Sequence, residues 1–119
     1  MTRFGIDIGT TSVCLVAVGD GGEVLFRASR PNDSGVTGGA EYMRLQDSER
    51  IYSICLDLLK SAEENGFLPD GIGVTGQMHG VVYVGGGKAL SPLATWQDGR
   101  GNLPFAGETT YAGEASRRS

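Results

Sequence analysis

Residue types that can hold a phosphate and a metal ion lie near the start of the chain, in the segment Gly5-Ile6-Asp7-Ile8-Gly9-Thr10-Thr11-Ser12. Gly9 lacks a Cβ, so a ligand can approach its backbone, and the hydroxyl and N–H groups of Thr10, Thr11 and Ser12 are neutral donors to anionic oxygens. A carboxylate repels phosphate unless a cation lies between them, so Asp7 indicates Mg²⁺, bound through water. The alternative is an ordinary hairpin turn in which Asp and Gly have only turn roles.

A second set of polar residues lies in a short segment bounded by Gly76 and Gly80. Gln77 and His79 can exchange hydrogen bonds with hydroxyl groups, and the Met78 thioether can lie against a C–H face of a sugar. These residues indicate a site for a polyhydroxylated ligand. The alternative is that His79, the single histidine of the chain, is a solvated or satisfied loop residue.

A third set follows in Thr95-Trp96-Gln97-Asp98-Gly99-Arg100. Trp96 is a flat aromatic, Asp98 only accepts hydrogen bonds when ionised, and Arg100 carries five donors. Such a set also suits a sugar. The alternative is a core or rim tryptophan beside an Asp98–Arg100 surface ion pair.

Two glycine-rich segments imitate nucleotide-binding motifs, as expected in a chain with 20 glycines among 119 residues. The GxGxxG pattern of residues 71–76 neither follows a strand nor opens a helix, so we expect it to be part of a strand. The segment Gly85-Gly86-Gly87-Lys88 lacks the first glycine and the Ser or Thr of a P-loop, and it predicts a hairpin turn.

The elements that must position these residues begin with three strands. Apolar runs at residues 3–8, 13–18 and 23–28 are separated by the turns of residues 9–12 and 19–22, which predicts an antiparallel meander. Residues 29–41, rich in glycine and polar residues, predict a long loop.

A helix is expected next, with Asp47 or Ser48 as its cap. Its apolar residues recur at the spacing of one helical face, and they are Ile51, Ile54, Cys55, Leu58, Leu59 and Ala62. Gly66 and Pro69 end it.

Three further strands are predicted, at residues 72–75, 81–84 and 88–90. After Trp96 the periodicity is weak, and we expect no closing element there. A meander, a helix and a strand parallel to the first predict an α/β domain with a mixed sheet. This order is typical of an RNase H-like domain of the actin and hexokinase superfamily, of which the chain would contain an incomplete part. The turn of residues 9–12 and that of residues 76–80 would then leave the same sheet, where ligands gather at strand ends.

Composition limits the classes of protein. A chain of 119 residues with 39% hydrophobic content can form one modest core, and its net charge of -4 disfavours nucleic acid and acidic membranes. No apolar run approaches the roughly 18 residues of a membrane span, and Met1 leads directly into a strand, so we expect a cytoplasmic protein. Cys14 and Cys55 lack metal-ligand spacing and are predicted to be reduced core residues.

Together the three polar segments resemble the N-terminal part of the FGGY family of carbohydrate kinases, over nearly the whole chain. Residues 5–12 resemble the first phosphate motif of the family. Residues 76–80 are similar to the GQMHG of its xylulokinase and sedoheptulokinase branches, and residues 96–100 to their WNDGR or WQDGR. The form WQDGR favours the sedoheptulokinase branch.

The resemblance implies a kinase that moves the γ-phosphoryl group of ATP to a hydroxyl of a ketose such as sedoheptulose or xylulose, using Mg²⁺. Asp7 would organise Mg²⁺ and its water, and Gly9, Thr10, Thr11 and Ser12 would hold phosphate oxygens. The sugar site would consist of Gln77, Met78, His79, Trp96, Asp98 and Arg100.

Kinases of this family are several times longer, and their general base and adenine pocket lie in parts with no counterpart here. Neither Glu108 nor Glu114 lies in a motif that resembles this base. The expectation is a truncated N-terminal part of domain I, residues 1–119, inactive alone, with domain II absent. Its uncovered sheet surfaces predict self-association into a homo-oligomer.

Two alternatives stay open. An Hsp70-like or actin-like ATPase fragment would share the first strand, turn and strand, but would have no need of the polar segments at residues 77–79 and 96–100. A non-catalytic sugar-binding module would keep the pocket and lack the reaction.

Overall fold

The computed structural model describes residues 1–107 and 109–118, so Glu108 lies outside the described residues. The chain divides into two compact units. The first contains residues 1–34 and 47–78, and the second contains residues 35–46 and the chain from His79 onward.

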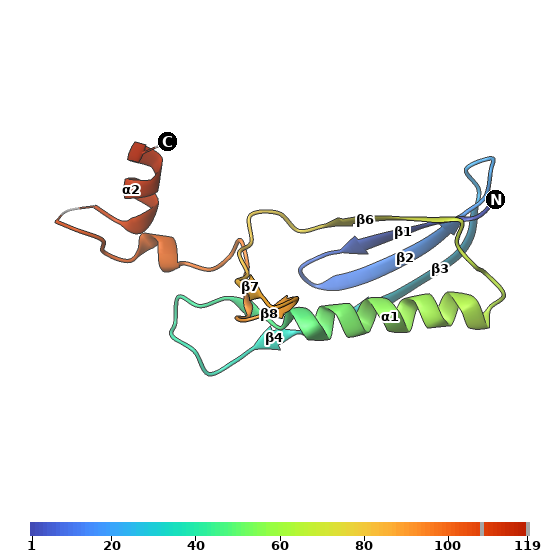
Figure 1. Cartoon of the computed structure of the whole chain (residues 1–119), viewed down its shortest axis with the longest axis horizontal. Helices are drawn as coiled ribbons and strands as arrows, with labels where there is room; N and C mark the ends of the chain where they lie inside the picture. Colours follow the sequence, from blue (N-terminus) through green and yellow to red (C-terminus); the bar gives the residue numbers. More distant parts are fainter. Residues whose placement is uncertain (108, 119) are drawn as a thin grey trace. The chain divides into compact units, whose positions relative to one another are not determined.

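The first unit contains a mixed four-stranded sheet (Figure 1). Its strands are β1 (Arg3–Ile8), β2 (Ser12–Val18), β3 (Val24–Pro31) and β6 (Gly71–Gly76), in the order β3-β2-β1-β6. β1 and β3 each pair antiparallel with β2, and β6 pairs parallel with β1. The expected meander and mixed sheet are confirmed. β3 extends beyond its predicted end at residue 28, because its pairing with β2 continues through Ser12 and Pro31.

The helix α1 (Ser48–Glu64) contacts β2 and β3 and lies along one side of this sheet in Figure 1. Asp47 caps its N-terminus, where Oδ1 accepts from Glu49 N at 3.0 Å and from Arg50 N at 3.4 Å. After its end Gly66 has a φ of +89°, a backbone conformation that favours glycine. Both predicted ends of the helix are therefore confirmed.

The core lies between α1 and one face of the sheet. It consists of alternate strand residues and the apolar stripe of the helix, namely Phe4, Ile6, Val13, Leu15, Ala17, Ile54, Leu58 and Ala62. The same alternation places Cys14 on the other face, so its predicted core position is wrong. Cys55 packs against the core, and both cysteines are free.

The GxGxxG segment forms β6 itself, as predicted. Ile8 pairs with Gly76 at the last position of the parallel register, so β1 and β6 end side by side. The turns that follow these two strands therefore leave the same edge of the sheet.

The second unit contains short strands. β4 (Gly35–Val36), β5 (Leu45–Gln46) and β9 (Leu93–Ala94) form one sheet, and β7 (Val84–Gly85) and β8 (Lys88–Ala89) form a hairpin. The hairpin turn is confirmed, with Gly86 and Gly87 at φ +59° and +76°.

Parts of this unit differ from expectation. The strand predicted at residues 81–84 is wrong over most of its length, because Val81 makes only an isolated bridge, to Ala94. A 3-10 turn (Arg100–Asn102) and the helix α2 (Tyr111–Arg118) follow where no element was expected. α2 is polar, and Glu114 pairs with Arg117 and Arg118 along it. The helix therefore has no apolar stripe from which the sequence could predict it. No helix among the described residues is long and apolar enough to cross a membrane.

Candidate functional site

The turn after β1 is a tight hairpin closed by Gly9. Its N–H donates to Ser12 O at 2.9 Å, and a Cβ on Gly9 would lie 2.9 Å from the same oxygen. Thr11 and Ser12 are exposed and Thr10 is half-buried. Within the described part of the chain, the N–H of Thr11 donates to no acceptor. The turn therefore offers the Thr11 N–H and the exposed hydroxyls of Thr11 and Ser12 to a ligand, while the Thr10 hydroxyl donates to Gln77.

Asn32 supports this turn from the end of β3. Its Nδ2 donates to Gly9 O at 2.9 Å, and its backbone N–H donates to Thr11 O at 2.9 Å. Its Oδ1 accepts from the hydroxyl of Ser34, which is 2% exposed. Ser34 O in turn accepts from Asp47 N at 2.7 Å, so the support reaches the first turn of α1. The sequence analysis missed Asn32, because a loop asparagine carries no signal of this role.

Asp7 lies on the sheet face opposite α1. It is exposed and borders a hollow of about 490 Å³ with Cys14 of β2 and Thr75 of β6 as neighbours. No group of three or more His, Cys, Asp or Glu residues among those described could hold a metal ion. Mg²⁺ commonly binds through one or two carboxylates, several waters and substrate phosphates, so the single carboxylate of Asp7 would fit it only together with a bound phosphate.

The turn after β6 is joined to the turn after β1. Thr10 Oγ1 donates to Gln77 Oε1 at 3.1 Å, and Gln77 N donates to Ile8 O at 2.9 Å. Gln77 is thus held against the first turn. Met78, which follows it, is 71% exposed.

The second unit contains a hollow of about 500 Å³ into which three of the predicted residues fall. His79, Asp98 and Arg100 line it, together with residues that the sequence analysis did not select: Met43, Leu45, Val81, Tyr83, Ser91, Pro92, Ala94 and Thr95. No sequence signal groups Met43 with Tyr83 or Ser91, because they are distant in sequence. Trp96 does not line the hollow and is 55% exposed.

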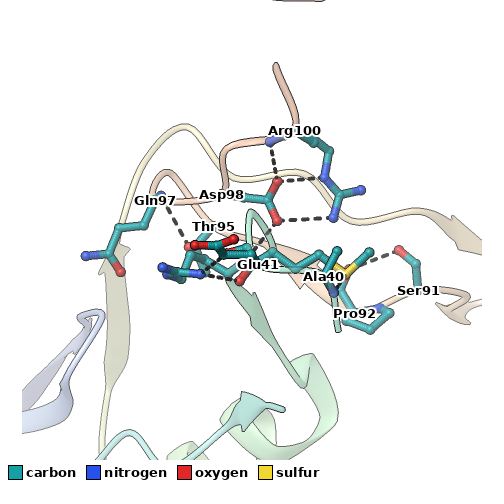
Figure 2. A network of polar contacts seen from close by, with 10 residues as sticks. Ala40, Glu41, Ser91, Pro92, Thr95, Gln97, Asp98 and Arg100 are labelled. Atoms are coloured by element: carbon teal, nitrogen blue, oxygen red, sulfur yellow. Dashed lines mark hydrogen bonds and ion pairs between the residues drawn. The ribbon is translucent and has the colours of Figure 1, made fainter. Parts of the chain in front are cut away.

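The segment of residues 95–100 is fastened to that of residues 42–44. Thr95 N donates to Arg44 O at 2.9 Å, and Gly99 N donates to Tyr42 O at 2.8 Å. Asp98 Oδ2 accepts from Arg44 N at 2.9 Å. Figure 2 shows Asp98 at the centre of this network.

Asp98 and Arg100 form a bidentate ion pair. Oδ1 accepts from Arg100 Nε at 2.7 Å and Oδ2 accepts from Nη2 at 3.1 Å. The Asp98 side chain is only 3% exposed, so the alternative of a plain surface pair does not describe it. The hydrogen bonds from the Arg100 side chain, helped by those from the Arg44 and Arg100 N–H groups, hold the pKa of Asp98 far below its ordinary 3.8.

His79 has a left-handed backbone, with φ at +61°. This region is rare for residues other than glycine, and strained residues of this kind cluster at functional sites. Histidine adopts this region more often than most residue types, so the conformation is also compatible with an ordinary loop position.

Comparisons with known proteins show the family of the chain. The sequence profile of the FGGY family of carbohydrate kinases, N-terminal domain, matches residues 2–103. The sedoheptulokinases of Mus musculus and Homo sapiens are 35% and 38% identical, and each match covers 85% of this chain. It covers 26% and 27% of those proteins, so the chain spans about a quarter of the length of these curated relatives.

Solved structures give the same result. A xylulose kinase from Rhodospirillum rubrum is 29% identical, with a TM-score of 0.69 over 85% of this chain and 22% of that one. A second structure, described as a xyloylose kinase from Brucella ovis, is 25% identical, with a TM-score of 0.73 over 86% of this chain and 22% of that one. These matches confirm the expected α/β fold class.

Proposed function

The chain belongs to the FGGY family of carbohydrate kinases, and we propose that it forms the phosphate-binding and sugar-binding part of an ATP-dependent kinase that acts on a ketose. The observation that carries this proposal is the 3.1 Å hydrogen bond from Thr10 to Gln77. It joins the phosphate turn to the first residue of the sugar segment at one edge of the sheet. Phosphoryl transfer depends mainly on such positioning of the two substrates and on neutralisation of charge.

For the phosphate side we propose that Thr10, Thr11 and Ser12 hold ATP oxygens through backbone N–H and hydroxyl groups, and that Gly9, whose own N–H donates to Ser12 O, lets the phosphate approach the backbone closely. Asp7 would hold Mg²⁺ through a bound water. The ion would supply neutralisation of the charge on the phosphate oxygens. The exposed carboxylate of Asp7 and its place in β1, two residues before Gly9, support this assignment.

For the sugar side we propose Gln77, Met78, His79, Trp96, Asp98 and Arg100. The shared hollow of His79, Asp98 and Arg100 supports three of these assignments. Sedoheptulose and xylulose are the proposed substrates, because the relatives named above are sedoheptulokinases and xylulose kinases.

We assign no general base within the described residues. Glu114 pairs with Arg117 and Arg118, and the hydrogen bond from Arg117 holds its pKa below the ordinary 4.5. We therefore propose that the 119-residue chain binds its ligands without transferring phosphate. Formation of ketose phosphate by the purified chain with Mg·ATP would contradict this.

Titration of the ¹⁵N-labelled chain with sedoheptulose or xylulose tests the proposal. We expect saturable shifts at His79 and Arg100, and separate shifts of Thr10 and Thr11 N–H signals with Mg·ATP. Asp7→Asn should remove the Mg²⁺ dependence of ATP binding, while the control Asp20→Asn, far from the turn at the other end of the strands, should not. No saturable shift with either sugar would refute the sugar part.

A non-catalytic sugar-binding module is a second candidate. The observation that favours it is that every residue lining the hollow belongs to the second unit, without any phosphate-binding residue. Sugar affinity that is unchanged by Mg·ATP would support this candidate over the kinase part.

A further inference from the structure

The Asp98 carboxylate has no acceptor capacity left for a ligand. Oδ1 accepts from the N–H of Arg100 at 3.0 Å and from its Nε at 2.7 Å. Oδ2 accepts from Arg44 N at 2.9 Å and from Arg100 Nη2 at 3.1 Å. An ionised carboxylate offers about four lone-pair sites, and here all of them are used. A sugar hydroxyl could bind Asp98 only by displacing one of these donors.

Arg100 is in the opposite situation. Its side chain is 48% exposed and lines the hollow. Its Nη1 donates to no acceptor within the part of the chain that the structure describes. The two N–H groups of Nη1 and the second N–H of Nη2 are therefore available to a ligand, and the bidentate pair fixes the plane of the guanidinium (Figure 2).

The charge of the pair also limits the ligand. Apart from His79, the charged side chains that line the hollow are Asp98 and Arg100, and their charges cancel. A guanidinium already paired with a carboxylate attracts a phosphate weakly, while its remaining N–H groups still donate to hydroxyl oxygens. The hollow therefore favours a neutral polyol.

We infer that Asp98 is a positioning residue that does not touch the sugar, and that it holds Arg100 so that the free guanidinium N–H groups donate to hydroxyl oxygens of an unphosphorylated ketose. This inference rests on the proposed function of the hollow. It changes the role of Asp98 from a sugar contact to a support for one.

The ion pair can be tested without any sugar. In the ¹⁵N-labelled protein the Arg100 Nε–H is bound to Asp98, so its signal should be resolved and slow to exchange at neutral pH. Asp98→Asn places an amide NH₂ against donors of Arg100 or Arg44, and should broaden or remove this signal. Glu114→Gln, which alters another paired carboxylate, should leave it unchanged. An Arg100 signal that is the same in Asp98→Asn would refute the positioning.

A double-mutant cycle then separates positioning from contact. Dissociation constants for sedoheptulose and xylulose are measured for wild type, Asp98→Asn, Arg100→Ala and the double variant, with circular dichroism to confirm that each is folded. We expect Asp98→Asn and Arg100→Ala each to weaken binding about tenfold, and Asp98→Asn to have no further effect once Arg100 is gone. A further loss of threefold or more in the Arg100→Ala background would show that Asp98 contacts the sugar or supports the fold, and would overturn the inference.

A phosphorylated ketose tests the charge. Xylulose 5-phosphate should bind at least tenfold more weakly than xylulose, and equal or tighter binding would contradict a neutral hollow. If the wild type binds no ketose at all, the proposed function fails along with the sugar contact. The Arg100 Nε–H signal would still decide separately whether Asp98 positions the guanidinium.

Discussion

Replacement of Asn32 by alanine should loosen the turn of residues 9–12, for which phosphate binding is proposed. The change removes the donor to Gly9 O, at 2.9 Å, and the acceptor of the Ser34 hydroxyl. The backbone bond from residue 32 to Thr11 O remains, so the end of β3 stays paired while the turn loses its side-chain support.

The magnitude follows from these contacts. Loss of the bond to Gly9 O lowers the free energy of unfolding by about 1 kcal/mol. Ser34 is 2% exposed, so its hydroxyl is left buried without a partner, which costs about 1–3 kcal/mol more. We therefore expect Asn32→Ala to lower the free energy of unfolding by about 2–4 kcal/mol.

Two matched variants separate the contributions. Asn32→Asp keeps the acceptor for Ser34 but faces Gly9 O with an oxygen, so it should lose the turn contact and add a repulsion there, without stranding the Ser34 hydroxyl. Adding Ser34→Ala to Asn32→Ala removes the stranded hydroxyl, and the double variant should be less unstable than the sum of the single variants.

Urea unfolding followed by far-UV circular dichroism measures these differences, with unchanged m-values as the sign that the denatured state is the same. The affinity for Mg·ATP, measured by calorimetry, should fall in parallel for Asn32→Ala and Asn32→Asp. An Asn32→Ala protein within about 0.5 kcal/mol of wild type would refute the supporting role, since that is the usual range for surface substitutions.

Four other perturbations have defined outcomes. Asp47→Ala removes the cap of α1 and should lower the free energy of unfolding by about 1 kcal/mol in urea titrations, whereas no change would deny the cap. Leu58→Ala leaves a cavity at a fully buried position and should lower the free energy of unfolding by about 2.7–5 kcal/mol, and a decrease of less than about 1 kcal/mol would contradict this. The pKa of Asp98 is depressed by folding, so its contribution to stability is complete above the ordinary 3.8 and lost as the pH falls below it. The difference in melting temperature between wild type and Asp98→Asn should thus be constant from about pH 8 to 5 and shrink toward pH 2, and a constant difference would disprove the pairing. Val74 is 64% exposed on the edge strand β6 and should promote self-association, seen in size-exclusion chromatography as a concentration-dependent shift that Val74→Lys reduces. A sharp monomer peak of the wild type at high concentration would contradict this.

The sequence predicts best where local pattern and packing agree. The alternation in β1 and β2 and the stripe of α1 face one another across the core, so each local preference matches its burial. The GxGxxG of residues 71–76 could be assigned to a strand because a β-branched context outweighs the glycine motif.

The sequence predicts least where a strand has only two residues or where the hydrogen-bond partner of a residue is distant along the chain. β4, β5 and β9 are too short for any periodicity, and α2 has no apolar face. Asp98 accepts from Arg44 N, which lies 54 positions away, so spacing could not decide between a buried position and the surface pair that was the alternative. Residue type selects the three polar segments, whose roles stay predictions, whereas nothing in the sequence points to the supports at Asn32 and Arg44.

The parallel pairing of β1 with β6 also determines when the binding site can form. β1 meets β2 through a short hairpin, but the contact from Thr10 to Gln77 closes a loop of 67 positions that includes all of α1. Closing a long loop is entropically unfavourable until tertiary contacts compensate, so local pairings form sooner. We therefore expect the meander and α1 to assemble first, and the junction of the two turns to be among the last parts of the chain to become protected from hydrogen exchange during refolding. A chain released from the ribosome before β6 would have the turn of residues 9–12 supported by Asn32 but without Gln77 beside it.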